Sequence, residues 1–353
     1  MPTISVAMAT FNGARFIDEQ LDSLARQTLP PDELVVSDDG STDDTLAIVQ
    51  AFAARAAFPV RVVHNERRLG FADNFLGAFA RCSGDVIALC DQDDVWLPHK
   101  LERLNAAFAD PAVAGVVHAA TVVDASLHPL PGRRLGPTDD ARYSPLARDP
   151  FDIDFGFSTA IRRTVLTLID PARRPGDLFP EYNVMAHDQW TRFLADAFGF
   201  TVAIAEPLAL YRQHGSNVVG APAAGAAAIE ALRNSAAAGA DRYDWLRRIA
   251  ADRSRVLAQA GPFADAVLEG RRLKAARRYA RLAANLHRRA ALYRSQALHE
   301  RMAGVARQVV MGGYTGRITG GLGLKALAKD TAFAVGLIGS ASAPLRSPVD
   351  AAE

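Results

Sequence analysis

Short apolar runs alternate with amphipathic segments through roughly the first 120 residues, and this alternation limits the fold more than any other feature of the sequence. The runs are rich in branched residues and are bounded by polar turns, as buried strands are. They occupy residues 4–8, 34–37, 60–63, 86–89 and 113–118. The alternation predicts an α/β fold with a mostly parallel, Rossmann-like sheet, right-handed crossovers and helices on both faces.

Composition supports a globular chain. The 353 residues are 49% hydrophobic and 22% charged, which is enough for one large domain or two modest ones. Two cysteines, Cys82 and Cys90, suit a reducing compartment, and a net charge of +1 argues against whole-protein attraction to nucleic acid. We read neither a signal peptide nor a membrane-spanning stretch, so we expect a cytoplasmic protein.

Polar turns follow three of the predicted strands. They are Thr10-Phe11-Asn12, Asp38-Asp39 and Asp91-Gln92-Asp93-Asp94. The carboxyl ends of parallel strands share one rim of a sheet, where open α/β sheets bind ligands. Three clustered carboxylates repel one another, and Mg²⁺ or Mn²⁺ would offset that repulsion and could bridge to a diphosphate. The alternative is a solvated acidic turn that caps the next helix.

The order of these motifs resembles glycosyltransferase family 2. The motifs are Thr-Phe-Asn at 10–12, Val-Val-Ser-Asp-Asp-Gly-Ser-Thr-Asp at 35–43, Asn-x-x-x-x-Gly-x-x-x-Asn at 65–74 and Asp-Gln-Asp-Asp-Val-Trp at 91–96. Together with Tyr-Arg-Gln-His at 211–214, the last motif most resembles the bacterial rhamnosyltransferase-like branch. The resemblance covers roughly residues 3–220 and implies a GT-A fold and an inverting reaction.

The resemblance also implies which residues bind the nucleotide. They are Thr10, Phe11, Asn12, Asp39, Arg67, Asp91 and Asp93. Asp39 would accept a hydrogen bond from the base, through the imide N–H of uracil or thymine, whereas Asp38 would hold the loop. The alternative for this turn is helix capping. Arg67 and Arg68 would contact the diphosphate or remain solvated.

The implied cofactor is Mn²⁺ or Mg²⁺, held by Asp93, Asp94 and His214, with Asp94 as the direct ligand. Asp188 would be the catalytic base, because a sugar hydroxyl must lose its proton as it attacks. Alternatively, Asp188 only caps its helix. His187 and Trp190 would bind the acceptor, although Trp190 could equally be a core residue.

The composition changes near residue 220, so we expect a GT-A domain over 1–220 and a helical, basic region over 221–353. Nine Lys and Arg residues lie between Gly270 and His299, with no acidic residue among them. This stretch could lie on an anionic membrane, which would suit a lipid-linked acceptor. The alternatives are an ordinary helix packed by its apolar stripe and, disfavoured by the lack of a motif, nucleic-acid binding.

These observations predict a metal-dependent, inverting glycosyltransferase. It would move one sugar from a nucleotide-diphosphate sugar, such as dTDP-rhamnose or a UDP-sugar, to a saccharide or lipid-linked acceptor in bacterial surface polysaccharide biosynthesis. The Gln-x-x-Arg-Trp motif of processive synthases is absent. One alternative is a sugar-phosphate nucleotidyltransferase, which the lack of a glycine-rich phosphate loop disfavours. Another is a non-catalytic nucleotide-sugar-binding protein.

Overall fold

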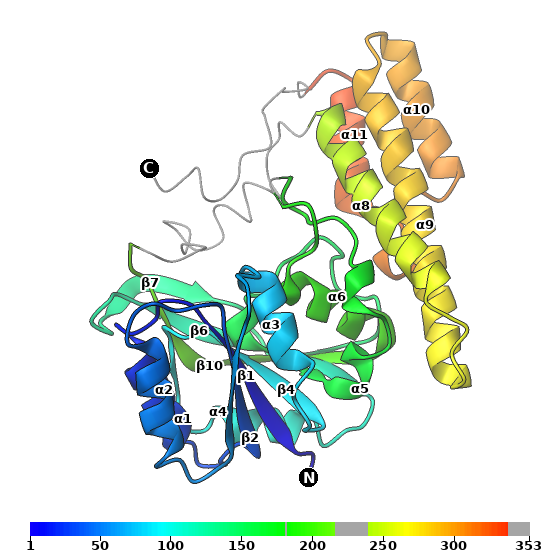
Figure 1. Cartoon of the computed structure of the whole chain (residues 1–353). Helices are drawn as coiled ribbons and strands as arrows, with labels where there is room; N and C mark the ends of the chain where they lie inside the picture. Colours follow the sequence, from blue (N-terminus) through cyan, green and yellow to red (C-terminus); the bar gives the residue numbers. More distant parts are fainter. Residues whose placement is uncertain (181, 216–238, 338–353) are drawn as a thin grey trace. The chain divides into compact units, whose positions relative to one another are not determined.

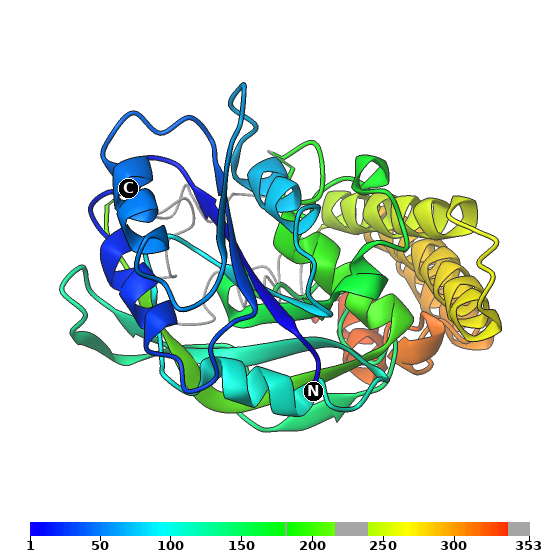
Figure 2. The same cartoon turned by 60° about the horizontal axis from the view of Figure 1, so that its bottom comes forward.

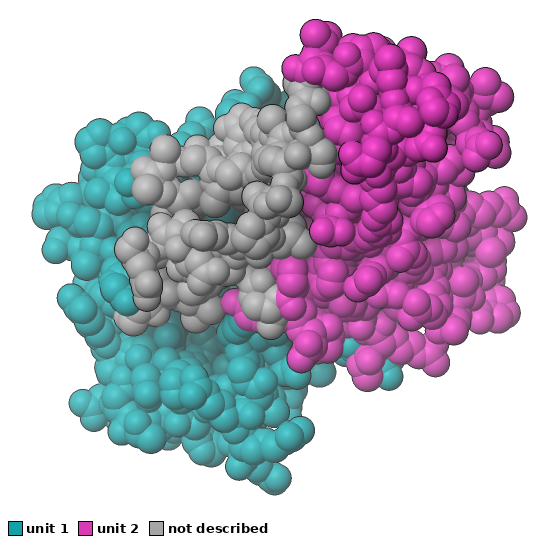
Figure 3. All heavy atoms as spheres, turned by 90° about the horizontal axis from the view of Figure 1, so that it is seen from above, with its two compact units in different colours: residues 1–144, 153–171, 186–225 teal, residues 145–152, 172–185, 226–353 magenta. Residues whose placement is uncertain are grey.

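The structure is a computed structural model, and it describes residues 1–180, 182–215 and 239–337. The chain forms two compact units, which Figure 3 shows in different colours. Unit 1 comprises Met1–Ser144, Ile153–Pro171 and Ala186–Gly225. Unit 2 comprises Pro145–Asp152, Ala172–Met185 and Ala226–Glu353.

Unit 1 is built on a mixed sheet, several strands of which are labelled in Figure 1. The ten described strands lie in the order β3-β2-β1-β4-β9-β6-β10-β5, with β7 beside β6 and β8 beside β10. The strands are β1 (Ile4–Thr10), β2 (Glu33–Asp38), β3 (Val60–His64), β4 (Val86–Cys90), β5 (Val95–Trp96), β6 (Val113–Val123), β7 (Pro129–Leu135), β8 (Ala141–Tyr143), β9 (Thr159–Arg162) and β10 (Phe200–Arg212). Strands β1 to β4 pair only in parallel with one another, as the alternation predicts.

Helices flank the sheet of unit 1 (Figure 2). They are α1 (Ile17–Ala25), α2 (Thr45–Ala53), α3 (Phe71–Phe79), α4 (Lys100–Ala107), α5 (Arg163–Leu166) and α6 (His187–Phe198), with short 3₁₀ turns at Gly156–Ser158 and Pro171–Arg173. Every residue of β2 and β4 is buried, which requires that both faces of the sheet are covered there. The predicted α/β architecture is therefore confirmed.

Part of the sheet is antiparallel, which the strand–helix alternation does not predict. Strand β9 lies between β4 and β6 and runs antiparallel to both, and β5 runs antiparallel to β10. Residues 124–153 contribute β7 and β8. These strands are short or exposed, so their own residues carry little periodicity, and only pairing with β6 and β10 holds them in the sheet.

Unit 2 is helical in its C-terminal part. Its helices are α8 (Ala240–Gln259), α9 (Ala266–Arg294), α10 (Leu298–Val310) and α11 (Leu324–Ala334), with a 3₁₀ turn at Arg317–Thr319. Helix α9 contacts the other three, and its Tyr279, Leu282 and Leu286 are buried. The basic stretch is thus an ordinary helix packed by its apolar stripe. Within the described residues, no helix combines the length and apolarity needed to cross a bilayer.

Side chains of α8 and α9 form hydrogen bonds with two earlier segments of unit 2, residues 145–152 and 172–185. Arg253 donates to the carbonyl of Pro150, and Arg278 donates to that of Arg148 at 3.2 Å. The indole of Trp245 donates to the carbonyl of Leu178 at 3.1 Å. Unit 2 therefore contains segments from before residue 220, whereas the composition predicted a single boundary there. These contacts join segments about 70 to 130 positions apart, which composition does not link.

Candidate functional site

The polar turns after β1, β2 and β4 are joined to one another at the carboxyl ends of their strands. The hydroxyl of Thr10 donates to Oδ1 of Asp38 at 2.9 Å, which links the first two turns. The side chain of Gln92 bonds the backbone of Phe11, which links the first and third. The structure thus brings the three sequence motifs to one rim.

Asp38 holds its own loop, as expected. Its carboxylate accepts hydrogen bonds from the backbone N–H groups of Gly40 and Ser41 and from the hydroxyls of Thr10 and Ser41. Burial works against the charged form, but these hydrogen bonds hold the pKa of Asp38 below its ordinary value. Asp38 is therefore an ionised structural residue.

Asp39 also holds a loop. Oδ1 accepts the backbone N–H of Leu69 at 2.6 Å, and Oδ2 accepts that of Gly70 at 2.8 Å. The amide of Asn65 donates to Oδ1 at 3.3 Å, and only 3% of Asp39 is exposed. A carboxylate can accept about four hydrogen bonds, so the expected bond from a base to Asp39 stays a prediction beside this loop contact.

The first turn contains residues of different kinds. Thr10 is 1% exposed and bonds inward, so it does not line a pocket as expected. Asn12 has a φ of 47°, and its side-chain oxygen accepts the backbone N–H of Thr42 at 2.9 Å. The guanidinium of Arg68 lies 3.9 Å from the ring centroid of Phe11. Phe11, the exposed Asn12 and the exposed Arg67 and Arg68 therefore belong to the accessible part of this region.

Gln92 is a site residue that the sequence reasoning missed. Its amide oxygen accepts the backbone N–H of Phe11 at 3.0 Å, and its amide nitrogen donates to the Phe11 carbonyl at 3.1 Å. A Cβ on Gly13 would lie 2.2 Å from that oxygen, so Gly13 leaves room for the Gln92 side chain. The signal was present in the motif, since a glutamine between carboxylates can both donate and accept.

We expect Gln92→Ala to weaken nucleotide-sugar binding about tenfold, because two backbone groups of Phe11 lose their partner, at a cost of about 1–3 kcal/mol each if they remain buried. Isothermal titration with the nucleotide diphosphate measures this. Gln50→Ala, on an exposed position of α2, is the matched control and should bind as the wild type does. Equal affinities in the two variants would contradict the role of Gln92.

Asp188 influences the acidic turn electrostatically, although it lies nearly 100 positions later in the chain. Burial, the charge of Asp93 and the charge of Asp188 together raise the pKa of Asp91 to about 7. The charge of one carboxylate acts on another most strongly at short range. This influence agrees with the predicted closeness of Asp188 to the acidic turn, and its role as the base stays a prediction.

Asp94 points inward, and its expected role as the direct metal ligand stays a prediction. The residue is 0% exposed, and its Oδ1 accepts the backbone N–H of Arg212 at 2.9 Å. Its Oδ2 is buried and accepts no hydrogen bond within the described part of the chain. Burial, followed by the charges of Asp93 and Asp91, raises the pKa of Asp94 well above its ordinary value.

Asp93 and His214 form the pair of this site that is best arranged to hold a cation. Nε2 of His214 lies 2.9 Å from Oδ2 of Asp93, and the imidazole packs 4.6 Å from the Phe16 ring. Among the described residues, no group of three or more His, Cys, Asp or Glu side chains is placed to hold a metal. One carboxylate and one imidazole still fit an ion that takes its remaining ligands from phosphate and water, and imidazole suits Mn²⁺ better than Mg²⁺.

Arg212 fixes the acidic turn from β10. Its Nε donates to the carbonyl of Asp93 at 2.8 Å and its Nη1 to the carbonyl of Ala125 at 2.7 Å, while Nη2 pairs with Glu19. Only 1% of Arg212 is exposed. This arginine therefore positions the turn and its neighbour His214 and is not open to phosphate.

Helix α6 begins at His187, so Asp188 lies in its first turn. His187 is 5% exposed and stacks on Phe75 with ring centroids 4.0 Å apart. Trp190 is fully buried against Phe193. Neither His187 nor Trp190 is thus presented to an acceptor, and the core alternative is correct for Trp190, because the apolar face of α6 packs on the sheet.

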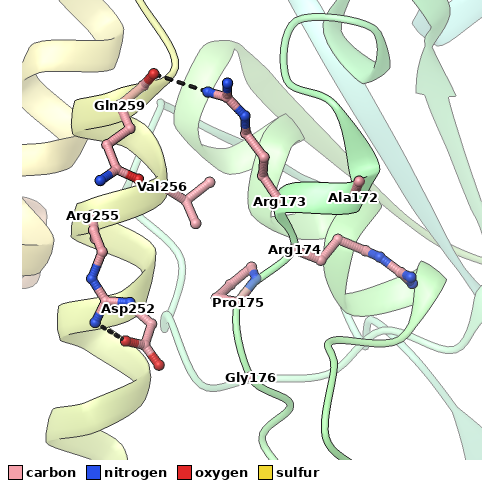
Figure 4. A pocket seen from close by; sticks show the side chains of 9 residues that line it. All are labelled: Ala172, Arg173, Arg174, Pro175, Gly176, Asp252, Arg255, Val256 and Gln259. Carbon is pink, nitrogen blue, oxygen red and sulfur yellow. Dashed lines mark hydrogen bonds and ion pairs between the residues drawn. The ribbon is translucent and has the colours of Figure 1, made fainter.

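A cavity of about 600 Å³ lies in unit 2, between residues 172–176 and helix α8 (Figure 4). Its cations already have partners within the wall. Arg173 donates to the carbonyl of Gln259 at 3.0 Å, and Arg255 pairs with Asp252. The cavity contains none of the residues of the rim described above.

Comparison with known proteins agrees with this geometry. Residues 5–167 match the family described as Glycosyl transferase family 2. An uncharacterized glycosyltransferase of Nostoc sp. is 34% identical over 121 residues, 34% of this chain and 37% of that protein. The validoxylamine A glucosyltransferase of Streptomyces hygroscopicus is 36% identical over 122 residues, 33% of this chain and 26% of that protein. The matches thus span about a third of the length of these curated relatives.

The fold has a counterpart among solved structures. Staphylococcus aureus TarS 1–349 in complex with UDP-GlcNAc superposes with a TM-score of 0.51 at 19% identity, over 86% of this chain and 79% of that one. This similarity concerns the fold alone. Residues 5–167 are thus similar in sequence to glycosyl transferase family 2, and the fold of the chain is similar to that of TarS 1–349.

Proposed function

We propose that this protein is a glycosyltransferase that moves one sugar from a nucleotide-diphosphate sugar to a saccharide or lipid-linked acceptor, with inversion at the anomeric carbon. The observation that supports the proposal most is the electrostatic influence of Asp188 on Asp91 in the Asp91–Asp94 turn, in a chain whose residues 5–167 match family 2. A base close to a diphosphate-binding turn is what a single displacement requires, because the acceptor attacks opposite the departing diphosphate.

Each residue of the rim has a proposed task in this reaction. Asp188 takes the proton of the acceptor hydroxyl, and its place in the first turn of α6 favours its ionised form. Phe11 and Arg68 receive the nucleotide, with Arg67 towards the diphosphate. Asp93 and His214 would hold Mn²⁺ or Mg²⁺, which supplies positive charge to the diphosphate leaving group. Gln92 and Arg212 keep these groups in place.

The pattern Asp-Gln-Asp-Asp-Val-Trp supports a donor of the rhamnosyltransferase-like branch, either dTDP-rhamnose or a UDP-sugar. A thermal-shift screen of dTDP- and UDP-sugars, with and without Mn²⁺, tests this proposal. We expect one donor to raise the melting temperature only in the presence of the ion, and to be hydrolysed or transferred. If no nucleotide sugar shifts the melting temperature under either condition, the proposed function is wrong.

We expect His214→Ala to reduce Mn²⁺-dependent binding of the donor by on the order of 10–100-fold, because the ion loses one of two protein ligands. The affinity for the nucleotide without metal should change little. Titration of the donor at several Mn²⁺ concentrations measures both quantities. His287→Ala, at an exposed position of α9, is the control, and an identical metal dependence in the two variants would remove His214 from the metal site.

We further propose a role in bacterial surface polysaccharide biosynthesis, in the cytoplasm and in peripheral contact with the anionic inner face of the membrane. The basic composition of residues 266–337 supports this contact, because the stretch contains 14 Lys and Arg residues and only three acidic residues, Glu269, Glu300 and Asp330.

A further inference from the structure

Helix α10 presents its apolar residues to solvent. Leu298 is 56% exposed, Met302 44%, Val309 51% and Val310 86%. These residues, with Ala306, recur at steps of four and three positions, so they form one stripe along the helix. We call Leu298, Met302, Ala306, Val309 and Val310 the α10 stripe. Amphipathic helices of globular proteins normally bury such a stripe.

The opposite face of α10 contains Gly304 and the buried residues Val305 and Gln308. Gln308 is 1% exposed; its Oε1 accepts from Nε of Arg288 at 2.6 Å, and its Nε2 donates to the carbonyl of Asn285 at 3.3 Å. Gly304 packs on Leu292, where a Cβ would lie 3.2 Å from a methyl carbon. The helix is thus docked on α9 through hydrogen bonds and a close approach, which keeps the stripe outward.

Hydrogen bonds connect the two ends of helix α11 to the two ends of α10. The backbone of Leu322, just before α11, donates to Gly313, just after α10, at 2.8 Å. At the other end of α11, the Phe333 carbonyl accepts from Arg301 near the start of α10 at 3.4 Å. The two helices therefore run antiparallel, and these bonds fix the orientation of α10 about its own axis.

Leaving the stripe in water is costly for the folded chain. At Leu298, Val309 and Val310, more than half of the residue's surface stays in water, so α10 forgoes much of the stabilisation that burial would give. Contiguous apolar surface of this kind on a soluble domain marks an interface. None of the described residues covers the stripe.

The net charge of residues 266–337, which include α10, indicates the kind of partner. Residues 266–337 carry 14 basic and three acidic side chains, a net charge of 14 − 3 = +11 with His neutral. Arg307 on α10, Lys325 on α11 and Lys274 and Arg277 on α9 are exposed, and none forms an ion pair with a described residue. A second copy of this region carries the same charge of +11 and would be repelled, whereas an anionic lipid surface would be attracted.

We propose that α10 binds an anionic bilayer, with the α10 stripe inserted at the level of the headgroups and Arg307 among the lipid phosphates. The inference names the surface for the membrane contact proposed above and rests on that contact, but it does not depend on the transfer reaction. It also differs from the sequence-based expectation, because the residues that enter the lipid belong to α10 and not to the basic helix α9.

Co-sedimentation of the full chain with vesicles tests the proposal without any donor or acceptor. We expect binding to vesicles of 30% phosphatidylglycerol in phosphatidylcholine, and little binding to phosphatidylcholine alone. The double variant Met302→Asp with Val309→Asp should bind at least about tenfold more weakly, because two inserted side chains become charged. Both positions are exposed, so circular dichroism and the melting temperature should match the wild type.

The matched control is Val267→Asp with Leu273→Asp, which adds the same charge at exposed apolar positions of α9. We expect it to retain most of the vesicle binding. Equal losses in the two double variants, or a wild type that does not bind anionic vesicles, would overturn the proposal. So would a dimer in light scattering that the α10 variant dissociates without a change in vesicle binding, because a second copy would then cover the stripe. Donor hydrolysis, measured separately, reports on the transfer function.

Discussion

Asp188→Asn should lower the rate of sugar transfer by about 10²–10⁴-fold while leaving the affinity for the nucleotide diphosphate unchanged. The amide keeps the shape of the side chain but cannot take the proton of the acceptor hydroxyl, and general bases contribute rate factors of about this size. Steady-state transfer assays give kcat, and titration with the nucleotide diphosphate gives the affinity. Asp18→Asn, on an exposed position of α1, should behave as the wild type does.

The same variant has a readout that does not require activity. Burial, the Asp93 charge and the Asp188 charge raise the pKa of Asp91 to about 7. Removing the Asp188 charge makes ionisation of Asp91 easier, so its pKa should fall in Asp188→Asn. Carbon NMR of the Asp91 carboxyl across pH 4–9 detects this. Unchanged transfer together with an unchanged Asp91 titration would place Asp188 away from the reacting groups.

Lys100→Met should destabilise the protein by about 3–5 kcal/mol, the usual cost of leaving a buried charge without its partner. Lys100 is 0% exposed; its Nζ donates to the Phe157 carbonyl at 2.7 Å and lies 3.5 Å from the Trp96 ring centroid. Burial lowers its pKa to about 7, whereas the charges of Asp94 and Asp91 favour its protonated form. Chemical denaturation of both proteins at one pH measures the difference.

Two further variants separate this effect from a general loss of packing. Lys274→Met, on an exposed position of α9, should change the free energy of unfolding by no more than about 0.5 kcal/mol. Asp94→Asn added to Lys100→Met should restore part of the lost stability, because it removes the charge that Lys100 balances. If the two substitutions are simply additive, Lys100 does not stabilise the acidic turn.

The strand–helix alternation was sufficient to predict β1 to β4 and the rim at their carboxyl ends. Each of these strands is a short apolar run whose periodicity is a local property of the sequence. Strand β9 could not be predicted in this way, because it is not specified by a local pattern. It has four residues, and its direction is set by β4 and β6 on either side.

The motifs located the candidate site but not the direction of its side chains. Asp39, Asp94 and Trp190 all lie on the expected elements, yet the first two bond backbone groups of the protein and the third is in the core. Their partners, Leu69 and Arg212, lie 30 and 118 positions away in the chain. Helix α10 shows the same limit, because its pattern predicts an apolar stripe without saying which way the stripe faces.

The sequence by itself determined the α/β class, the sharing of one rim by three polar turns and the presence of a long basic helix, since strand direction, side-chain periodicity and charge are local or additive. Only the tertiary structure decided that Asp93 and not Asp94 faces His214, that the charge of Asp188 acts on Asp91, and that α10 turns its apolar face outward. Those outcomes depend on hydrogen bonds and burial between distant segments, and a residue's own neighbours in the chain do not specify them.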